Sequence, residues 1–383
     1  MSLLGHFPCA RIPIMDDIKY WVALSGVSLL GTVRFRRLEA HFGDLRHAWE
    51  ASPAELKAAG IENGPAREIL AARDTISPEA EQERLERASV RPINWNSPEY
   101  PWRLKEIHDP PPVLYVKGTL LPEDERAVAV VGTRGPTAYG REAASVLAAD
   151  LARNGITIVS GLARGIDGIA HRATLDAGGR TIAVVANGLD IVYPSEHAGL
   201  SRRAEEQGAV VSEYPLGVRP NPRSFPRRNR LISGMSLGTL VIEAPETSGA
   251  TWTVQHALEQ DREVFCVPGS IFSPTSKFTN RMIQQGAKLV STYQDVLEEL
   301  NLNVVSQQIE LPLNIGTEDE DETDLLQYLN DQPLHIDDIR SSASLPIAAV
   351  SSMLSMLEIK GKVKQVGCMH YVRMQEKTAI YGN

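Results

Sequence analysis

The chain has 383 residues, 43% of them hydrophobic, and a formal net charge of −9, which suits a protein of two or three globular domains. No apolar run approaches ~18 residues and the N-terminal residues lack a signal-peptide layout, so we expect a cytoplasmic protein without membrane insertion. The cysteines Cys9, Cys266 and Cys368 are far apart, which argues against a disulfide framework and against a metal site.

Residues 1–90 are predicted to form a helical domain, because apolar residues recur at helical spacing between glycines. The stretch LSGVSLLGTVRFRRLEAHFG has the pattern of a helix-hairpin-helix or SAM-like module, in which hairpin amides can hold a DNA phosphate. A structural helical cap fits the same pattern, with Arg34, Arg36 and Arg37 as a solvated face. The sequence leaves both interpretations open.

Residues 91–300 are predicted to form a doubly wound α/β domain. The proline-rich segment 91–118 is interpreted as a linker that runs into an edge strand, since proline cannot donate to a sheet ladder. Short apolar runs separated by helical segments then predict a parallel sheet. The predicted strands are 127–131, 156–159, 181–185, 209–211, 239–242 and 264–267.

Glycine-bearing turns follow the first two predicted strands, and each leads into a helix. Free backbone N–H groups and the positive end of the helix dipole favour an anion at such a turn. We therefore expect phosphate contacts from these turns and from a further amide nest before a later helix. The predicted residues are Gly132, Thr133, Arg134, Ser160, Gly161, Arg164, Gly165, Ser248 and Gly249.

A dinucleotide site is the first alternative for such turns. The glycines at 132, 135 and 140 are spaced G-x-x-G-x-x-x-x-G rather than G-x-G-x-x-G, and the second strand ends in Ser160-Gly161 instead of a ribose-binding acid. A Walker lysine is missing as well. We therefore expect no cofactor.

Five arginines, no acid and one aromatic residue lie between positions 219 and 230. Guanidinium groups pair with phosphates and an aromatic ring stacks on a base, so this composition favours single-stranded nucleic acid. The alternative is a solvated loop with Phe225 tucked into the core. The predicted contacts are Arg223, Phe225, Arg227, Arg228, Asn229 and Arg230.

The sequence supports a catalytic site less well than it supports a nucleic-acid site. Asp167 and His171 would share a helix face, and Ser160 or Ser233 could be imagined as a nucleophile. Spacing alone supplies neither an orienting acid nor a third metal ligand, so we expect structural roles and no catalytic residue.

The C-terminal part has a different composition. Residues 301–320 are predicted to be an acidic, disordered linker. Residues 321–383 follow the order helix, helix, helix and hairpin, which is typical of a winged helix. The third predicted helix has no Lys or Arg before Lys360, which favours docking to a protein over reading duplex DNA.

Several motifs together resemble the bacterial DNA-processing protein A family, DprA or Smf. They are VGTR-x-x-T-x-YG at 131–140, SGLARGID-x-x-AH at 160–171, GLD-x-x-YP at 188–194, SE-x-P-x-G at 212–217, FPRRNRLISG at 225–234, EAxxxSGAxxT at 243–253 and VPG at 267–269. The resemblance covers nearly the whole chain. It implies a helical SAM-like domain, an extended Rossmann domain and a winged helix.

The resemblance also implies a function. Such a protein holds incoming single-stranded DNA during natural transformation, protects it and loads the RecA recombinase on it. It further implies a homodimer through residues 279–290, with Asn280, Ile283 and Leu289 at the interface.

An enzyme remains the second class of function. The family is similar in fold to Rossmann proteins that hydrolyse nucleotide N-glycosidic bonds with a P-G-G-x-G-T-x-x-E turn, but the matching segment ETSGATWT lacks that acid. Two stretches also depart from the family pattern. VANGLD replaces V-x-G-x-GLD and so loses one turn glycine, and GATWTVQHA stands where relatives have G-S-L-I-T-A.

Overall fold

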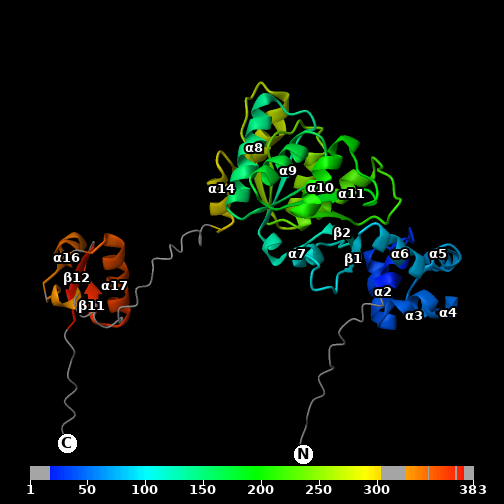
Figure 1. Cartoon of the computed structure of the whole chain (residues 1–383), viewed down its shortest axis with the longest axis horizontal. Coiled ribbons are helices and arrows are strands. Elements are labelled where there is room, and N and C mark those ends of the chain that lie inside the picture. Colours follow the sequence, from blue (N-terminus) through cyan, green and yellow to red (C-terminus); the bar gives the residue numbers. More distant parts are fainter. Residues whose placement is uncertain (1–17, 303–324, 331, 344, 367–368, 375–383) are drawn as a thin grey trace, which may run out of the picture. The chain divides into compact units, whose positions relative to one another are not determined.

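The computed structural model describes residues 18–302, 325–330, 332–343, 345–366 and 369–374 (Figure 1). The chain divides into two compact units, one within residues 1–306 and the other within residues 307–383. Residues 303–320 of the predicted acidic linker lie outside the described part of the chain.

The first unit is built on a nine-stranded sheet in the order β1-β2-β6-β5-β4-β3-β7-β8-β9. Strands β3 to β9 are parallel, whereas β2 pairs antiparallel with β6 and β1 pairs antiparallel with β2. The strands are β1 (Arg91–Asn94), β2 (Val113–Gly118), β3 (Ala127–Val131), β4 (Thr157–Ser160), β5 (Thr181–Val185), β6 (Gly208–Ser212), β7 (Gly238–Val241), β8 (Glu263–Cys266) and β9 (Lys288–Leu289). The predicted α/β fold class is confirmed.

Strand β3 lies at the point where the strand order reverses. From β3 the chain builds outward through β4, β5 and β6, and it then returns to the other side of β3 for β7, β8 and β9. In open parallel sheets, ligands bind at this switch point, beyond the carboxyl ends of the strands.

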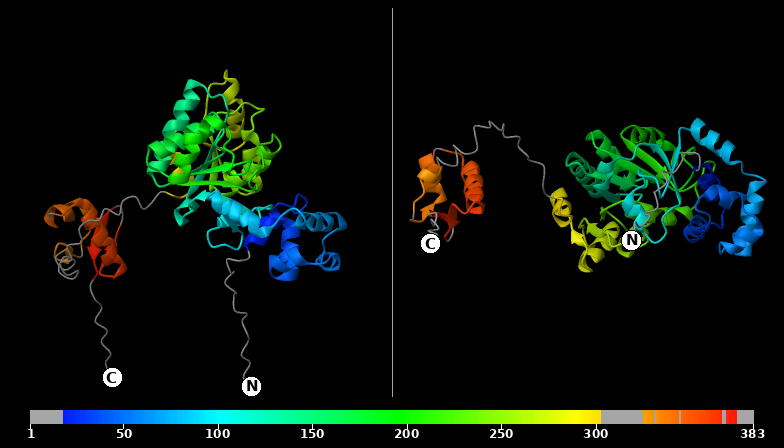
Figure 2. Two further views of the ribbon diagram at one scale, coloured as in Figure 1. Left: turned by 45° about the vertical axis from the view of Figure 1, so that its right-hand side comes forward. Right: turned by 90° about the horizontal axis from the view of Figure 1, so that it is seen from below.

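Helices cover both faces of the sheet (Figures 1 and 2). Alternate residues of β3 enter two separate cores: Val128 and Val130 pack on one face, and Ala127 and Ala129 on the other. The first core includes residues of α8 (Ala138–Arg153), α9 (Ile166–Asp176) and α14 (Tyr293–Glu299). The second includes residues of α10 (Ala198–Glu206), α11 (Ser224–Gly234), α12 (Ala250–Glu259) and α13 (Lys277–Gln284). Short 3-10 turns occur at Pro122–Glu125, Ser195–His197 and Pro274–Ser276.

The predicted N-terminal helical region is confirmed. It comprises α1 (Ile18–Ser25), α2 (Thr32–Phe42), α3 (Leu45–Glu50), α4 (Pro53–Ala58), α5 (Asn63–Arg73) and α6 (Pro78–Arg87). These helices share one hydrophobic core with β1, β2 and one face of the sheet. The hydroxyls of Ser25 and Tyr115 lie 2.7 Å apart and join α1 to β2.

The interpretation of residues 91–118 as a linker is wrong. This segment supplies β1, the short helix α7 (Trp102–Glu106) and β2, and β2 lies inside the sheet with Tyr115 fully buried. The proline run at 110–112 precedes β2, so it removes no hydrogen-bond donor from the strand itself. Pro92 is tolerated because β1 is an edge strand.

The second unit has the winged-helix order. It contains β10 (Leu334–His335), α16 (Ile336–Ala343), α17 (Ile347–Ile359), β11 (Val363–Gln365) and β12 (His370–Arg373). The three strands form a sheet in the order β10-β12-β11, and β10 was not predicted. Val350 and Leu354 of α17 pack with Tyr371 in the core of this unit. Among the described residues, no helix has both the length and the apolar character that a membrane span requires.

Candidate nucleic-acid interface

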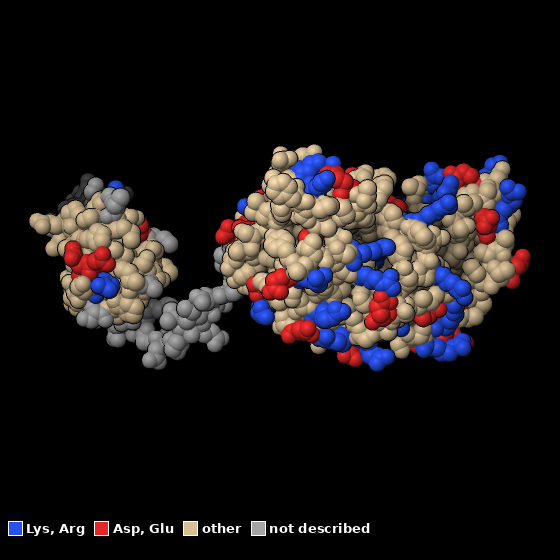
Figure 3. Space-filling model, turned by 90° about the horizontal axis from the view of Figure 1, so that it is seen from above, with Lys and Arg blue, Asp and Glu red and all other residues tan. Residues whose placement is uncertain are grey.

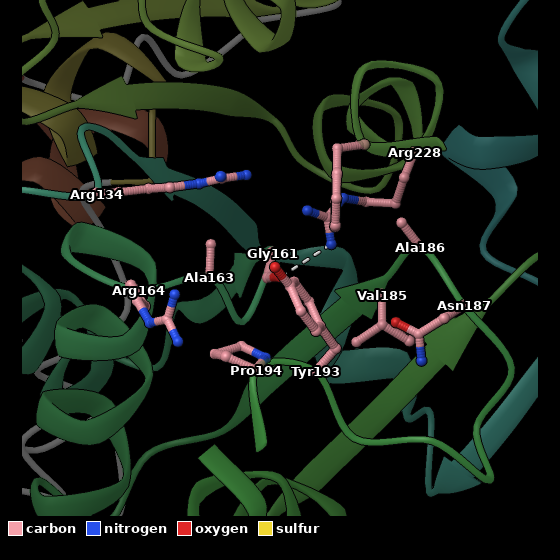
Figure 4. A pocket seen from close by; sticks show the side chains of 11 residues that line it. Arg134, Gly161, Ala163, Arg164, Val185, Ala186, Asn187, Tyr193, Pro194 and Arg228 are labelled. Atoms are coloured by element: carbon pink, nitrogen blue, oxygen red, sulfur yellow. Dashed lines mark hydrogen bonds between the residues drawn. The ribbon is translucent and has the colours of Figure 1, made fainter. Parts of the chain in front are cut away.

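A pocket lies beyond the carboxyl ends of β3, β4 and β5 and is closed on one side by α11 (Figure 4). It is a small, open pocket, and the space within it, including the part open to solvent, is about 400 Å³. The lining residues are Arg134, Gly161, Ala163, Arg164, Val185, Ala186, Asn187, Tyr193, Pro194, Phe225 and Arg228.

The turns after β3 and β4 are in direct contact at the base of this pocket. Ile166 N donates to Thr133 O at 3.2 Å, and Gly165, at the end of the turn after β4, has φ +76°. A Cβ on Gly165 would lie 2.3 Å from Thr133 O and 2.7 Å from the Cα of Arg134. Glycine is therefore required here, both by the left-handed backbone and by the close approach of the two turns.

The protein itself occupies two of the amides expected to hold a phosphate. Thr133 N donates to Glu243 O at 2.7 Å, and Gly161 N donates to Asp167 Oδ2 at 3.1 Å. The carboxylate of Asp167 thus fills the second predicted nest from inside. These two amides are therefore not free to hold an external phosphate.

The residues considered for catalysis make hydrogen bonds inside the protein. Ser160 Oγ donates to Val130 O at 2.6 Å, and Ser233 Oγ donates to Gln260 Oε1 at 2.8 Å. His171 is fully buried, with Nδ1 2.6 Å from Thr181 Oγ1. Burial, followed by the nearby His197 and Arg228, lowers the pKa of His171 to about 3, so the imidazole is neutral at pH 7.

The arginine-rich segment is partly helical, which the sequence did not indicate. Helix α11 begins at Ser224 and turns Arg228, Asn229 and Arg230 into the protein, where all three are buried. Arg228 Nη1 donates to Gly161 O at 2.9 Å and to Val184 O, so it ties the ends of β4 and β5 to α11. Burial lowers the pKa of Arg228 to about 10, and the group still carries a positive charge at pH 7.

Arg230 points away from the pocket and into a cluster of acceptors. Its Nη1 and Nη2 donate to the two carboxylate oxygens of Glu213 at 2.7 and 2.8 Å, and its Nε donates to Asp109 O at 3.0 Å. Burial opposes the charge of Arg230, but Glu213 raises the pKa overall. A phosphate would have to compete with these partners, so we assign Arg230 to positioning α11 rather than to direct phosphate contact.

Asn229 likewise faces a neighbouring helix. Its Nδ2 donates to Gly249 O at 3.2 Å, and Ser248 Oγ accepts from Ala250 N at 3.2 Å at the start of α12. The bond between Asn229 and Gly249 joins α11 to the start of α12, and Asn229, Ser248 and Gly249 do not line the pocket.

Four of the predicted arginines are exposed: Arg134, Arg164, Arg223 and Arg227. The guanidinium carbon of Arg134 lies 5.5 Å from the centre of the Phe225 ring. Arg164 pairs with the exposed Glu196, and this hydrogen bond raises the pKa of Arg164. Arg227 lies 3.6 Å from Glu213.

The aromatic wall of the pocket contains a residue that the sequence analysis missed. Tyr193, in the turn after β5, lies 5.7 Å from Phe225 between ring centroids, with the ring planes tilted by 33°. Tyr193 is 42% exposed and Phe225 is half-buried, so both present ring surface to the pocket. The motif GLD-x-x-YP contains Tyr193, but only its place on the sheet edge shows that it meets Phe225.

The chain matches two known family models. Residues 91–301 match the model described as DNA recombination-mediator protein A, and residues 311–367 match the DprA winged helix domain. The chain belongs to the DNA recombination-mediator protein A family. The resemblance drawn from the sequence motifs is confirmed.

Individual relatives support this membership. The chain is 34% identical to "Protein Smf" of Synechocystis, over 92% of this chain and 98% of that protein. It is 46% identical to "DNA processing protein DprA" of Bacillus subtilis, over 55% of this chain and 71% of that protein.

Two solved structures are similar as well. The X-ray structure of DprA from Streptococcus pneumoniae has a TM-score of 0.64 at 34% identity and covers 73% of this chain and 97% of that chain. A structure of DprA from Helicobacter pylori, described by its single-stranded DNA binding mode, has a TM-score of 0.51 at 28% identity and covers 57% of this chain and 99% of that chain.

In this family member, charge is distributed in small groups. On the face of the larger unit drawn in Figure 3, basic side chains are interspersed with acidic ones and form no continuous basic surface. Among the described residues, no group of three or more His, Cys, Asp and Glu side chains could hold a metal ion.

The segment expected at a dimer interface lies at the far edge of the sheet. Leu289 is on the edge strand β9 and is 43% exposed, whereas Ile283 on α13 is partly buried against the core. The side chain of Asn280 is used inside the subunit, since it accepts from Gly269 N at 3.1 Å and donates to Gly269 O at 2.9 Å.

Proposed function

We propose that this chain binds single-stranded DNA, with one nucleotide seated in the pocket at the ends of β3, β4 and β5. The observation that carries the proposal is the pairing of an aromatic wall, Phe225 and Tyr193, with the exposed cations Arg134 and Arg164 at the same opening. Unpaired bases stack on aromatic rings while arginines contact the phosphates, and a duplex does not offer its base faces in this way. The Helicobacter pylori relative is described by its single-stranded DNA binding mode, which supports the proposal.

The parts of the site have separate roles. Arg134, Arg164, Arg223 and Arg227 are exposed and contact phosphates, whereas Arg228 and Arg230 hold the floor and helix α11 in place. Because Gly165 and Arg228 fix the turns after β3, β4 and β5, the rim is organised before DNA arrives. Binding therefore costs little further conformational entropy of the protein at this rim.

Family membership supports a wider role. We propose that the protein protects incoming DNA and loads the RecA recombinase on it during natural transformation, in the cytoplasm and as a homodimer. Two subunits would place two pockets on one strand and so raise the apparent affinity through effective concentration.

An N-glycosidase-type activity is not favoured by the pocket. The described residues that line it supply three arginines and no carboxylate. Glu243, the acid that follows β7, is buried and accepts from Thr137 N at 2.9 Å, Thr137 Oγ1 at 2.7 Å and Thr275 Oγ1 at 3.0 Å. This carboxylate fastens three loops together, and we propose a binding protein rather than an enzyme.

A titration of labelled single-stranded and duplex oligonucleotides tests the proposal. The single strand should bind more tightly, and Phe225→Ala and Tyr193→Ala should each weaken binding by about 1 to 3 kcal/mol, whatever the base sequence. Trp102→Ala is the matched control, because Trp102 is an aromatic residue of similar exposure, 42%, outside the pocket. Equal affinity for single strand and duplex, or losses no larger than in the control, would refute it.

The dimer has its own test. Leu289→Glu places a charge on the exposed edge strand and should give a folded monomer in light scattering, with weaker binding of long strands only. A dimer that survives both this substitution and Ile283→Glu would exclude the proposed interface.

A further inference from the structure

The side chain of Asn187 is held in one fixed orientation at the inner end of the pocket. It is 1% exposed and belongs to the lining, in the turn that follows β5. Its Nδ2 donates to Gly188 O at 2.9 Å and to Ile191 O at 2.6 Å. Both partners are carbonyl oxygens, which only accept, so the nitrogen must face them and the amide cannot be reversed.

The carboxamide oxygen is consequently the part of Asn187 that is left for a ligand. Within the described part of the chain, no donor reaches Oδ1. In Figure 4 the oxygen lies on the side of Val185 and Tyr193, while the nitrogen points away from them. The pocket therefore presents a hydrogen-bond acceptor beside its aromatic wall.

The backbone around this acceptor is tied down. Ser212 Oγ donates to Asn187 O at 2.7 Å, and Gly188 N donates to Val218 O at 2.9 Å. Because the turn is held at both residues, Oδ1 stays in place without a ligand. A fixed acceptor in a nearly buried position discriminates strongly between groups that can and cannot donate to it.

We infer that Asn187 selects the base in the pocket by accepting from the amino group at C6 or C4, and so favours adenine and cytosine over guanine, thymine and uracil, which carry a carbonyl oxygen there. The inference rests on the proposed binding of a single-stranded nucleotide at this site. Cytosine offers an N4 amino donor, whereas thymine and uracil offer at the same position the O4 acceptor, which repels the fixed Oδ1, and donate only from N3–H, one ring position away. The protein would thus prefer certain bases at one nucleotide of a strand that it otherwise binds without regard to sequence.

Oligonucleotides of deoxycytidine and deoxyuridine, titrated against the full chain, isolate this effect. Neither base has the 5-methyl group of thymine. Both strands offer the same phosphates, so the electrostatic part of binding cancels when their two affinities are compared as a ratio. One neutral hydrogen bond corresponds to a preference of about three- to tenfold for the cytosine strand. Wild-type protein that binds the two strands equally would overturn the inference.

One variant connects the preference to Asn187. Asn187→Ala removes the acceptor and should bring the cytosine-to-uracil ratio close to one, even if loss of the two loop hydrogen bonds weakens both strands alike. A ratio unchanged in Asn187→Ala would assign Asn187 to loop structure only.

These outcomes are distinct from failure of the proposed function. If the proposed site is wrong, Arg134→Ala will leave the affinity for both strands unchanged, whatever their ratio. If the site is correct, Arg134→Ala will weaken both strands equally and leave their ratio as in the wild type.

Discussion

Arg230 and Glu213 form a buried two-pronged ion pair beneath helix α11, with N–O distances of 2.7 and 2.8 Å. The side chains are 8% and 6% exposed. The pair connects α11, the helix that carries Phe225, to the end of β6. Arg230 Nε also donates to Asp109 O, just before β2, at 3.0 Å. We regard this ion pair as the main interaction that orients α11.

Removing one partner should destabilise the protein strongly. Arg230→Ala leaves the Glu213 carboxylate buried without its partner, which costs about 3 to 5 kcal/mol in the free energy of unfolding. Denaturant titration measures this loss. Arg227→Ala is the matched control, since Arg227 lies 3.6 Å from the same carboxylate but is 57% exposed, and should cost at most about 1 kcal/mol. Equal, small losses in both variants would contradict the assigned role.

Much of the fold was predictable because the strands of the parallel sheet are short, apolar and buried on both faces. The predicted runs 127–131 and 181–185 coincide with β3 and β5, and the other four agree to within a residue at each end. Within residues 91–118 only an edge strand after a linker was predicted, because the prolines dominate the local pattern, so β1 and the inner position of β2 were missed. The two-residue strands β9 and β10 have too little sequence to show a pattern.

The site was only partly predictable. The arginine cluster was visible, but composition cannot show that α11 begins at Ser224 and turns Arg228 and Arg230 inward. Helix periodicity was obscured by Pro226 and by the charges. Tyr193 and Phe225 are 32 positions apart in the sequence, and only the sheet topology brings the turn after β5 next to α11.

Glu196 should act as a local competitor of DNA phosphate. It pairs with the exposed Arg164, whose hydrogen bond lowers the pKa of Glu196, so the carboxylate is charged at pH 7. Glu196→Gln removes the competing charge and should raise single-strand affinity by a few-fold, most clearly at low salt. Anisotropy titration measures this change in affinity. Glu205→Gln is the control, because Glu205 is an acidic residue of α10 outside the pocket. Weaker DNA binding by Glu196→Gln would contradict the prediction.

His171 should make stability depend on pH. Its pKa is about 3 in the folded protein against 6.5 when free, so the unfolded chain takes up a proton first as the pH falls. Stability should be lost between pH 6.5 and 3, at up to about 1.4 kcal/mol per pH unit from this group. Denaturant titrations at several pH values should show a shallower decline in His171→Gln than in the wild type. Identical pH slopes would mean that His171 does not titrate as described.

The salt dependence of single-strand binding tests the central proposal most directly. Each phosphate contact contributes about 0.7 to the slope of log affinity against log salt concentration. We predict that Arg134→Ala lowers both the affinity and this slope, by about one contact per pocket. Arg153→Ala, which removes an exposed arginine paired with Asp150 at the end of α8, should change neither. A slope in Arg134→Ala identical to that of the wild type would contradict the account.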